Sequence, residues 1–224
     1  MSTIAVSYFD AVEKALDALP PGSAVMLDHL DWDDYENLLG EIDGVRNFKL
    51  MYDNGRLEAM TLSPEHEKPK IFLTSLIIIL AEELDLKLIG HGSTTLRKKN
   101  KRKGADPDDS YYLENADQIR GKTRINLASD PPPDLAIEID VTSYSLDKFA
   151  IYAALGVPEF WRYENKGMRF YRLEGGQYTE TPVSDHFPFL TPQTLGDYLA
   201  LGESEDITTM NRAFRKWVRE HKPY

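Results

Sequence analysis

The spacing of apolar residues along the chain predicts helices near both ends and strands in between. Helical spacing over Ser7–Leu19 and over Asp31–Ile42 predicts two amphipathic helices near the start, and the second has an acidic outer side. Ser63–Glu65 is typical of a helix start, because proline is tolerated at the first position and an acid favours the positive end of the helix dipole. This helix should extend to about Leu84. Since it is apolar on most sides, we expect it to be central and buried.

Shorter apolar runs predict the strands. The clearest pair, 48–52 and 56–62, flanks Asp53–Gly55, because an Asn-Gly pair accepts the positive φ angles of a tight hairpin turn. Further strands are expected at 23–27, 86–90, 93–96, 109–113, 133–140, 159–163, 168–173 and 177–181, and further helices at 146–155, 191–201 and 206–222. This order of elements predicts an α+β fold, a mixed sheet with helices on its faces.

The length and composition are typical of an ordinary globular protein. The 224 residues are enough for one well-buried domain, and we expect an acidic helical extension over 1–44, a main domain over 45–202 and a terminal helix over 203–224. The absence of cysteine excludes disulfides and thiolate metal sites, and it favours the cytoplasm. We expect no secretory signal, because the start lacks a basic segment followed by a long apolar one. No apolar run is long enough to span a bilayer, so no membrane partner is expected.

The formal net charge of −11 opposes nucleic-acid binding, because a negative protein repels phosphate over about a Debye length. The charge is segregated, however. Residues 28–43 contain seven acids and no Lys or Arg, whereas six bases stand close together: Arg97, Lys98, Lys99, Lys101, Arg102 and Lys103. This basic run can bind phosphates with salt-dependent affinity. A solvated loop is the more ordinary interpretation of a charge run.

The segment 131–163 carries the most informative pattern of the chain. After three prolines, Leu135, Ile137 and Ile139 share one side of a predicted strand. Glu138 lies between two of them and on the other side. Burying a bare carboxylate is costly, so a buried Glu138 must be hydrogen-bonded, paired with a cation or bound to a metal. A strand with one side in solvent would give the same alternation, and the pattern alone leaves both interpretations open.

A second acid, Asp108, follows Pro107 at the entry of the predicted strand 109–113. Carboxylates on neighbouring strands can share a cation, because strands in a sheet lie about 4.8 Å apart. Mg²⁺ prefers carboxylate, carbonyl and water oxygens, so Asp108, Glu138 and the carbonyl of Ile139 form a candidate magnesium site. Without the cation, repulsion should raise the pKa of at least one carboxyl group. Taken alone, an Asp after a proline more often belongs to a turn.

Several motifs between about residues 45 and 200 occur in an order that resembles a known family. They are Tyr52–Met60 (YDNGRLEAM), Gly104–Asp108 (GADPD), Pro133–Glu138 (PDLAIE), Asp147–Lys148, Tyr152, Gly156–Glu159 and Trp161. Together they resemble the PD-(D/E)XK nuclease superfamily, and in particular a family of putative restriction endonucleases that is abundant in cyanobacteria. The resemblance implies a restriction-endonuclease-like core with helices on the faces of a mixed, curved β-sheet.

The resemblance assigns roles to four candidate catalytic side chains. Asp108 matches the metal-binding aspartate of the superfamily, and Glu138 matches the acid of its (D/E)XK strand. Two residues after Glu138 the chain has Asp140 instead of the expected lysine. Lys148 stands in the first turn of the following helix, from which such proteins can supply that lysine. Glu58, on the hairpin, matches a position that often carries an acid near the metal. By default, a lysine at a helix start is exposed.

The resemblance implies a metal-dependent endonuclease that hydrolyses DNA phosphodiester bonds with Mg²⁺ or Mn²⁺. In this interpretation Asp108 and Glu138 bind the metal and Lys148 assists the attack of water. The basic run contacts DNA. A homodimer would let two related sites cut both strands of a duplex. The terminal helix, with Phe214, Trp217 and Val218, and the N-terminal extension are the candidate contacts between copies.

Two other functions stay open. Asp140 at the lysine position and the acidic balance favour a catalytically inactive nuclease-fold protein that acts as a binding or scaffold module. A metal-dependent hydrolase of another phosphate ester is a weaker alternative. The chain has no Walker-type or dinucleotide-binding glycine motif, which argues against nucleotide-driven or redox chemistry. His66, at the start of the long apolar helix, is interpreted as a surface or capping residue and left out of the catalytic set.

Overall fold

The computed structural model describes residues 8–42, 48–140 and 146–223. The helices are α1 (Tyr8–Asp17), α2 (Trp32–Glu41), α3 (Pro64–Glu83), α4 (Ala116–Ile119), α5 (Lys148–Leu155), α6 (Pro192–Ser204) and α7 (Ile207–His221), with a 3-10 turn η1 (Lys99–Lys101). The strands are β1 (Ala24–Leu27), β2 (Phe48–Asp53), β3 (Arg56–Thr61), β4 (Ile89–Gly90), β5 (Leu96–Lys98), β6 (Lys103–Ala105), β7 (Asp109–Tyr112), β8 (Leu135–Asp140), β9 (Glu159–Glu164), β10 (Gly167–Glu174) and β11 (Gln177–Thr181).

The first sheet has the strand order β1-β3-β2-β6-β5, and all its neighbouring strands are antiparallel. β2 and β3 form the expected hairpin, in which Asn54 and Gly55 have φ angles of 48° and 97°. An Asn-Gly pair adopts these positive values at little cost. Tyr35 of α2 stacks on Tyr52 of β2, with ring centroids 4.6 Å apart, in the apolar core under α1 and α2.

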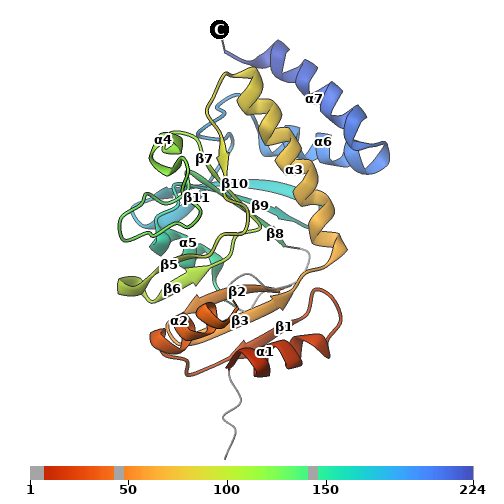
Figure 1. Ribbon diagram of the computed structural model, residues 1–224. Coiled ribbons are helices and arrows are strands. Elements are labelled where there is room, and N and C mark those ends of the chain that lie inside the picture. Colours follow the sequence, from red (N-terminus) through yellow and green to blue (C-terminus); the bar gives the residue numbers. More distant parts are fainter. Residues whose placement is uncertain (1–7, 43–47, 141–145, 224) are drawn as a thin grey trace, which may run out of the picture.

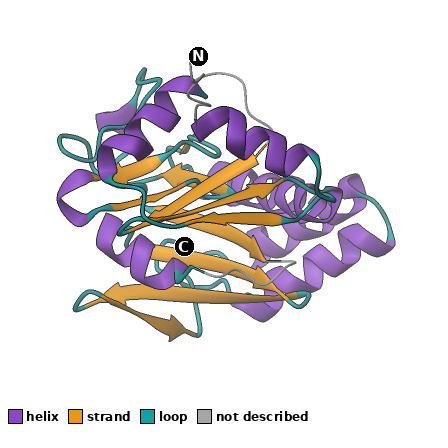
Figure 2. Cartoon of the chain, turned by 90° about the horizontal axis from the view of Figure 1, so that it is seen from below, coloured by secondary structure: helices purple, strands orange, loops and turns teal. Residues whose placement is uncertain are grey.

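The second sheet has the order β11-β10-β9-β8-β7-β4 (Figure 1). β8 and β9 are parallel, and the other pairs are antiparallel. α3, α6 and α7 pack on one face, where they meet Leu135, Ile137 and Ile139 of β8. α5 packs on the other face, where Ala136 lies. Figure 2 shows helices on both sides of the strands.

The α+β class and the mixed sheet with helices on its faces are confirmed. The strands divide between two sheets, however, because β6 pairs with β2, whereas the next strand, β7, pairs with β8. The basic run was not expected to form strands, but its two ends belong to β5 and β6, which form a hairpin around η1. α4 was not expected either.

Helix α3 departs from the prediction of a central buried helix. Most of its residues are buried against the second sheet and α7, but Ile71 and Ile78 are exposed. The helix therefore covers a sheet and leaves two isoleucines exposed on its outer side. No helix within the described residues combines the length and the apolar character that crossing a membrane requires.

The N-terminal segment 8–42 shares its structure with strands that come later in the chain. β1 pairs with β3 over four residues, and α1 and α2 pack on the core of the first sheet. The three-part division at residues 44 and 202 stays a prediction.

Gly104 of β6 lies at a close contact with α2. A Cβ atom at this position would overlap the ring of Tyr35, which is buried. Gly104→Ala is therefore expected to lower the free energy of unfolding by about 1–3 kcal/mol, because a packed core does not accept an added methyl group without strain. Urea unfolding measures the change.

Gly40→Ala in α2 is the matched control. A Cβ atom at Gly40 meets nothing within 4 Å, and alanine favours a helix over glycine by about 1 kcal/mol. We expect this variant to be as stable as the wild type or slightly more so. A Gly104→Ala protein with wild-type stability would contradict the packing of α2 against β6.

Candidate active site

The chain passes from the first sheet to the second between Asp106 and Asp108. Asp106 is still bonded to β2: its N–H donates to the carbonyl of Leu50 at 3.0 Å, and its carboxylate accepts from the N–H of Leu50 at 2.7 Å. Asp108 is already bonded to β8. Its N–H donates to the carbonyl of Ile137 at 3.0 Å, and its carboxylate accepts from the N–H of Ile139 at 2.8 Å. We call this segment the crossover.

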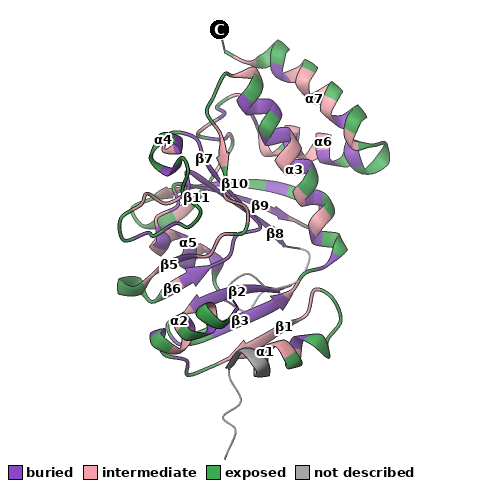
Figure 3. Ribbon diagram, viewed as in Figure 1, coloured by how far each residue is buried: buried purple, intermediate pink, exposed green. Residues whose placement is uncertain are grey.

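Glu138 of β8 is 1% exposed and lies on the side covered by α5. One carboxylate oxygen accepts from Lys148 Nζ at 2.6 Å, and the other accepts from the hydroxyl of Tyr152. Figure 3 shows β8 coloured as buried, and all six of its residues are. The interpretation of β8 as a strand with one side in solvent is therefore wrong.

Lys148 is held where α5 begins. The side chain of Asp147 caps the helix by accepting from a backbone N–H of the first turn, so the helix starts two residues later than predicted. Lys148 is 5% exposed, and its Nζ donates to Glu138 at 2.6 Å and to Asp140 at 2.5 Å. Asp140 also accepts from Arg162. The default expectation of an exposed Lys148 is wrong. Asp140, which stands where the (D/E)XK strand usually has its lysine, forms an ion pair with Lys148.

Lys49 of β2 is a site residue that the sequence analysis missed. It is buried, and its Nζ lies 2.5 Å from a carboxylate oxygen of Asp108. Burial alone would lower the pKa of Lys49, but Asp108 and Glu138 together raise it above its ordinary value. The only sequence signal was a lysine inside an otherwise apolar strand. That signal does not identify a partner 59 positions further along the chain.

Glu58 lies on β3, which pairs with β2, and is buried. Its carboxylate accepts from the N–H of Leu146, just before α5, at 3.3 Å. Glu58 and Glu138 line the same small cavity, of about 10 Å³, which is about enough for one water molecule. The other lining residues are Lys49, Leu50, Met51, Met60 and Asp106. The structure thus gathers all four candidate catalytic residues near the crossover, while their catalytic roles stay predictions.

The two acids next to the crossover have opposite pKa shifts. Burial raises the pKa of Glu138 to about 7, and the negative charges of Asp108 and Asp140 add to this, while Lys148 and Lys49 oppose it. Burial also acts to raise the pKa of Asp108, but the charges of Lys49 and Lys148 and the bonds from Lys49 and a backbone N–H lower it to about 2. The expected repulsion thus contributes to the shift of Glu138, with burial as the larger cause.

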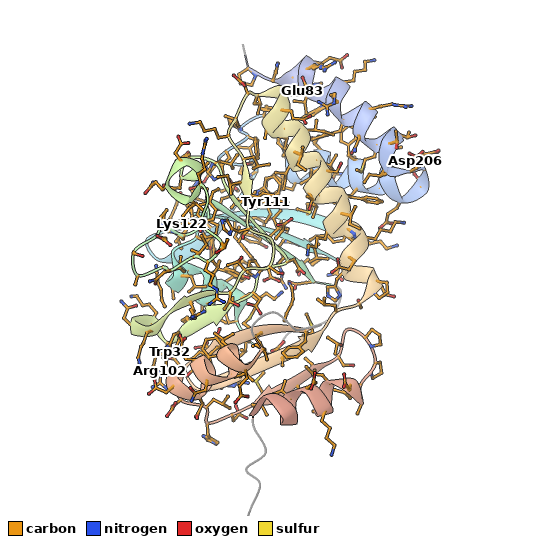
Figure 4. The ribbon with its side chains drawn as sticks, in the orientation of Figure 1. Trp32, Glu83, Arg102, Tyr111, Lys122 and Asp206 are labelled. Carbon is orange, nitrogen blue, oxygen red and sulfur yellow. The ribbon has the colours of Figure 1, made fainter. Side chains whose placement is uncertain are left out.

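The basic run contacts the acidic helix α2. Arg97 Nε lies 2.9 Å from a carboxylate oxygen of Glu36, and Lys99 Nζ lies 3.1 Å from one of Asp33. Figure 4 labels Arg102 of the same run and Trp32 at the start of α2. The two oppositely charged segments of the sequence therefore pair in space at Arg97 and Lys99, and the side chains of both bases are exposed to solvent.

The other bases of the run have different environments. Lys103 pairs with Asp53 of the hairpin, and Lys98 donates to a backbone carbonyl of α5. Lys101 and Arg102 are exposed and form no ion pair within the part of the chain that the structure describes. A groove of about 1330 Å³ lies between this run, α2 and residues 123–128.

Asp108 and Glu138 are the best candidates to hold a divalent cation. Within the described ranges, no three His, Cys, Asp or Glu side chains form a group that could hold a metal ion. Mg²⁺ does not require such a group, because it keeps several waters and binds one or two carboxylates together with substrate phosphates. The oxygen donors therefore fit Mg²⁺ or Mn²⁺, but a cation would have to share these carboxylates with the ammonium groups of Lys49 and Lys148.

The raised pKa of Glu138 predicts a pH dependence of stability. The folded protein binds this proton up to about pH 7, whereas the unfolded chain releases it near the ordinary pKa of 4.5. The contribution of Glu138 to the free energy of unfolding should therefore fall as the pH rises across this interval, by roughly 3 kcal/mol at most. Asp108, with its lowered pKa of about 2, titrates below the interval and leaves this slope unaffected.

Urea unfolding at several pH values across the interval measures the slope. Glu138→Gln stays neutral throughout and should remove this contribution, so the free energy of unfolding of the wild type minus that of the variant should fall as the pH rises. Equal slopes for the two proteins would show that Glu138 does not hold its proton in the folded state.

Comparison with known proteins places the chain in a family. No curated protein matches it. Among solved structures, it is similar to a putative nuclease belonging to DUF820 from Anabaena variabilis ATCC 29413, at 14% identity over 67% of this chain and 90% of that one, with a TM-score of 0.48. The model of the Uma2 family, described as putative restriction endonuclease, matches residues 32–202, which include the four candidate catalytic residues. The resemblance seen in the sequence is thus confirmed, and the chain belongs to the Uma2 family of putative restriction endonucleases.

Proposed function

We propose that this protein is a divalent-metal-dependent endonuclease that hydrolyses phosphodiester bonds in DNA. The observation that carries the proposal is the buried convergence of Asp108, Glu138 and Lys148 beside the crossover. Buried charges are costly even when they are paired, and apolar residues of similar size would often stabilise a fold more. A perturbed pKa beside specific charge partners is typical of functional sites. Membership in a nuclease family supports the same conclusion.

Each residue of the site has a separate role in the proposed hydrolysis. Asp108 and Glu138 would hold Mg²⁺ or Mn²⁺, which when bound would supply positive charge to the phosphoryl oxygens and lower the pKa of bound water. Lys148 keeps an ammonium group next to Glu138, where it offsets the negative charge that develops during the reaction. Glu58 shares the small cavity with Glu138 and bonds the backbone just before α5.

The second candidate is a nuclease-fold protein without catalysis. Asp140 at the usual lysine position favours it, because the (D/E)XK strand then lacks its own cation. Lys148 weakens this argument, since its Nζ reaches Glu138 and Asp140 together. The two candidates differ in what neutralising Glu138 does: it abolishes cleavage in the first and leaves partner binding intact in the second.

We also propose a cytoplasmic homodimer built from the extension 1–44, the domain 45–202 and the terminal helix 203–224. The terminal helix uses Phe214 and Val218 inside its own fold, where both are fully buried. A contact between copies would therefore have to involve other residues. Ile71 and Ile78, exposed on α3, are available for it.

Cleavage of supercoiled plasmid DNA with Mn²⁺ tests the endonuclease. Glu138→Gln should reduce the rate at least about 100-fold, because it removes a charge from the reacting site. Glu159→Gln is the matched control. Glu159 is equally buried and accepts from Trp161 Nε1 at 2.6 Å, but it pairs in register with Leu135, at the other end of β8 from Glu138. This variant should cut like the wild type.

Calorimetry with Mn²⁺ adds a measurement that does not depend on cleavage, and Glu138→Gln should weaken binding. A wild-type protein that binds no Mn²⁺ and leaves duplex and single-stranded DNA intact would exclude the proposed function. Hydrolysis of a small phosphodiester without any DNA cleavage would favour the hydrolase of another phosphate ester.

The basic run predicts a salt dependence of DNA binding. Lys101 and Arg102 are exposed, so the double variant Lys101→Ala/Arg102→Ala should reduce the slope of log affinity against log salt by about two. Arg97→Ala/Lys99→Ala should change the slope less, because Glu36 and Asp33 already compensate these bases.

Fluorescence anisotropy of a labelled duplex at several salt concentrations measures both effects. Lys166→Ala/Lys216→Ala removes the same charge from the β9–β10 turn and α7, and it controls for net charge alone. Equal slopes for this control and for Lys101→Ala/Arg102→Ala would exclude the basic run as a DNA contact.

A further inference from the structure

His66 lies in the first turn of α3 and is 2% exposed, so the interpretation of this histidine as a surface residue is wrong. α3 follows β3, the strand that carries Glu58, and it packs on β8. Figure 1 shows the start of α3 next to the end of β8 and above the first sheet. The charged groups that act on the imidazole are those of the site: Asp108, Lys49, Lys148 and Asp140.

The surroundings of His66 favour one tautomer. Nδ1 lies 2.7 Å from the hydroxyl oxygen of Ser63. The backbone N–H of Glu65 and the Ser63 hydroxyl lower the pKa of the Glu65 carboxyl group, which directs the single hydroxyl proton toward that carboxylate. The favoured tautomer is then the one in which Ser63 accepts from Nδ1–H. In this tautomer the ring carries its proton on Nδ1 and a lone pair on Nε2.

Nε2 of His66 is buried and has no hydrogen-bond partner among the residues that the structure describes. A buried acceptor without a donor is uncommon in native proteins, and each case requires an explanation. In this place the simplest explanation is a ligand or substrate group that supplies the proton. Such a group would bind in the candidate active site, next to the start of α3.

Phosphodiester hydrolysis needs an acceptor for a proton of the attacking water. Lys148 Nζ forms ion pairs with two carboxylates, at 2.6 Å from Glu138 and 2.5 Å from Asp140, and as the ammonium partner of these pairs it offers no lone pair. Asp108 already forms an ion pair with Lys49 and accepts from a backbone N–H, and Glu138 accepts from Lys148 and Tyr152. Both carboxylates are also the proposed metal ligands. A neutral imidazole is the more suitable base.

We propose that His66 is the proton acceptor of this site, with Ser63 and Glu65 as the residues that position its ring; this rests on the proposed function. The oxygen of water forms a bond to phosphorus, and the bond from phosphorus to the leaving ester oxygen breaks. One proton of the water passes to Nε2 of His66, and the leaving oxygen takes a proton from the solvent. His66 then returns its proton to the solvent, and the ring is ready for another cycle.

The surroundings keep His66 unprotonated. Burial lowers its pKa below 6.5, and the positive charges of Lys49 and Lys148 act in the same direction, while Asp108 and Asp140 oppose them. The ring is therefore neutral at neutral pH. The cleavage rate should rise with pH as His66 loses its proton and then stay level.

Three variants test the proposal in the full-length protein with supercoiled plasmid DNA and saturating Mn²⁺. His66→Gln keeps a polar group of similar reach but no basic nitrogen, and it should cut at least about 100-fold more slowly, without the rise at low pH. His66→Ala should lose as much. Ser63→Ala keeps the imidazole but no longer fixes its tautomer. The cleavage rate is expected to fall roughly tenfold, as for other positioning partners. Calorimetry should find Mn²⁺ affinity within about threefold of wild type in all three, because His66 is not a proposed metal ligand.

Nitrogen NMR of the ¹⁵N-histidine-labelled, metal-free protein gives a readout that does not depend on cleavage. His66 is one of five histidines, and its signals are identified by their absence in His66→Gln. We expect a proton on Nδ1 and none on Nε2, and broadening of these signals when Mn²⁺ binds. If His66→Gln does not fold, the absence of the signals in His66→Ala identifies them instead, and this measurement and Ser63→Ala decide.

Each outcome has one meaning. Wild-type cleavage together with a His66→Gln rate within threefold of it would overturn this inference and leave the endonuclease standing. A proton on Nε2 in the NMR spectrum would also overturn it. A wild-type protein that cuts no DNA would overturn the proposed function, and the role of His66 with it.

Discussion

The crossover at Asp106–Asp108 is the constraint on which the site depends. Within three residues the backbone stops pairing with β2 and begins to pair with β8. The hydrogen bonds of Asp106 and Asp108 fix the two ends of this segment. This places a carboxylate between two sheets, out of water, next to the middle of β8. Burying it is tolerable only if a cation or several donors lie nearby. Lys49 from the first sheet and a backbone N–H from the second supply them. The same hydrogen bonds and ion pair therefore fix both the path of the backbone and the charges of the site.

Local features of the structure were predictable from the sequence. The Asn-Gly hairpin, the start of α3 at Pro64 and the alternation in β8 each depend on residues close together in the chain. The family motifs further indicated which acids and which lysine meet. The ion pair of Lys49 with Asp108 was not predictable, because it joins strands of two sheets, and a residue pattern does not show which strands meet.

A residue pattern does not show which distant elements meet, and this also explains the other features that the sequence did not predict. Alternation in β8 shows two sides, but only tertiary packing shows that α5 covers the second one and buries Glu138. The ion pairs of the basic run were not predictable, because its acidic partners in α2 stand about 60 positions earlier. His66 looked like a capping residue because its bond to Ser63 is local, whereas the charges that surround it come from other strands and from α5.

The proposed chemistry has a consequence for the order of binding. In the described structure the ammonium groups of Lys49 and Lys148 already compensate Asp108, Glu138 and Asp140. A divalent cation that enters alone must share this space with two positive charges, and in a buried site their repulsion is weakly screened. A DNA phosphate changes the balance, because its negative charge can pair with ammonium groups that the carboxylates release to the metal. Metal and DNA should therefore bind more tightly together than either does alone, and by linkage each raises the affinity for the other by the same factor.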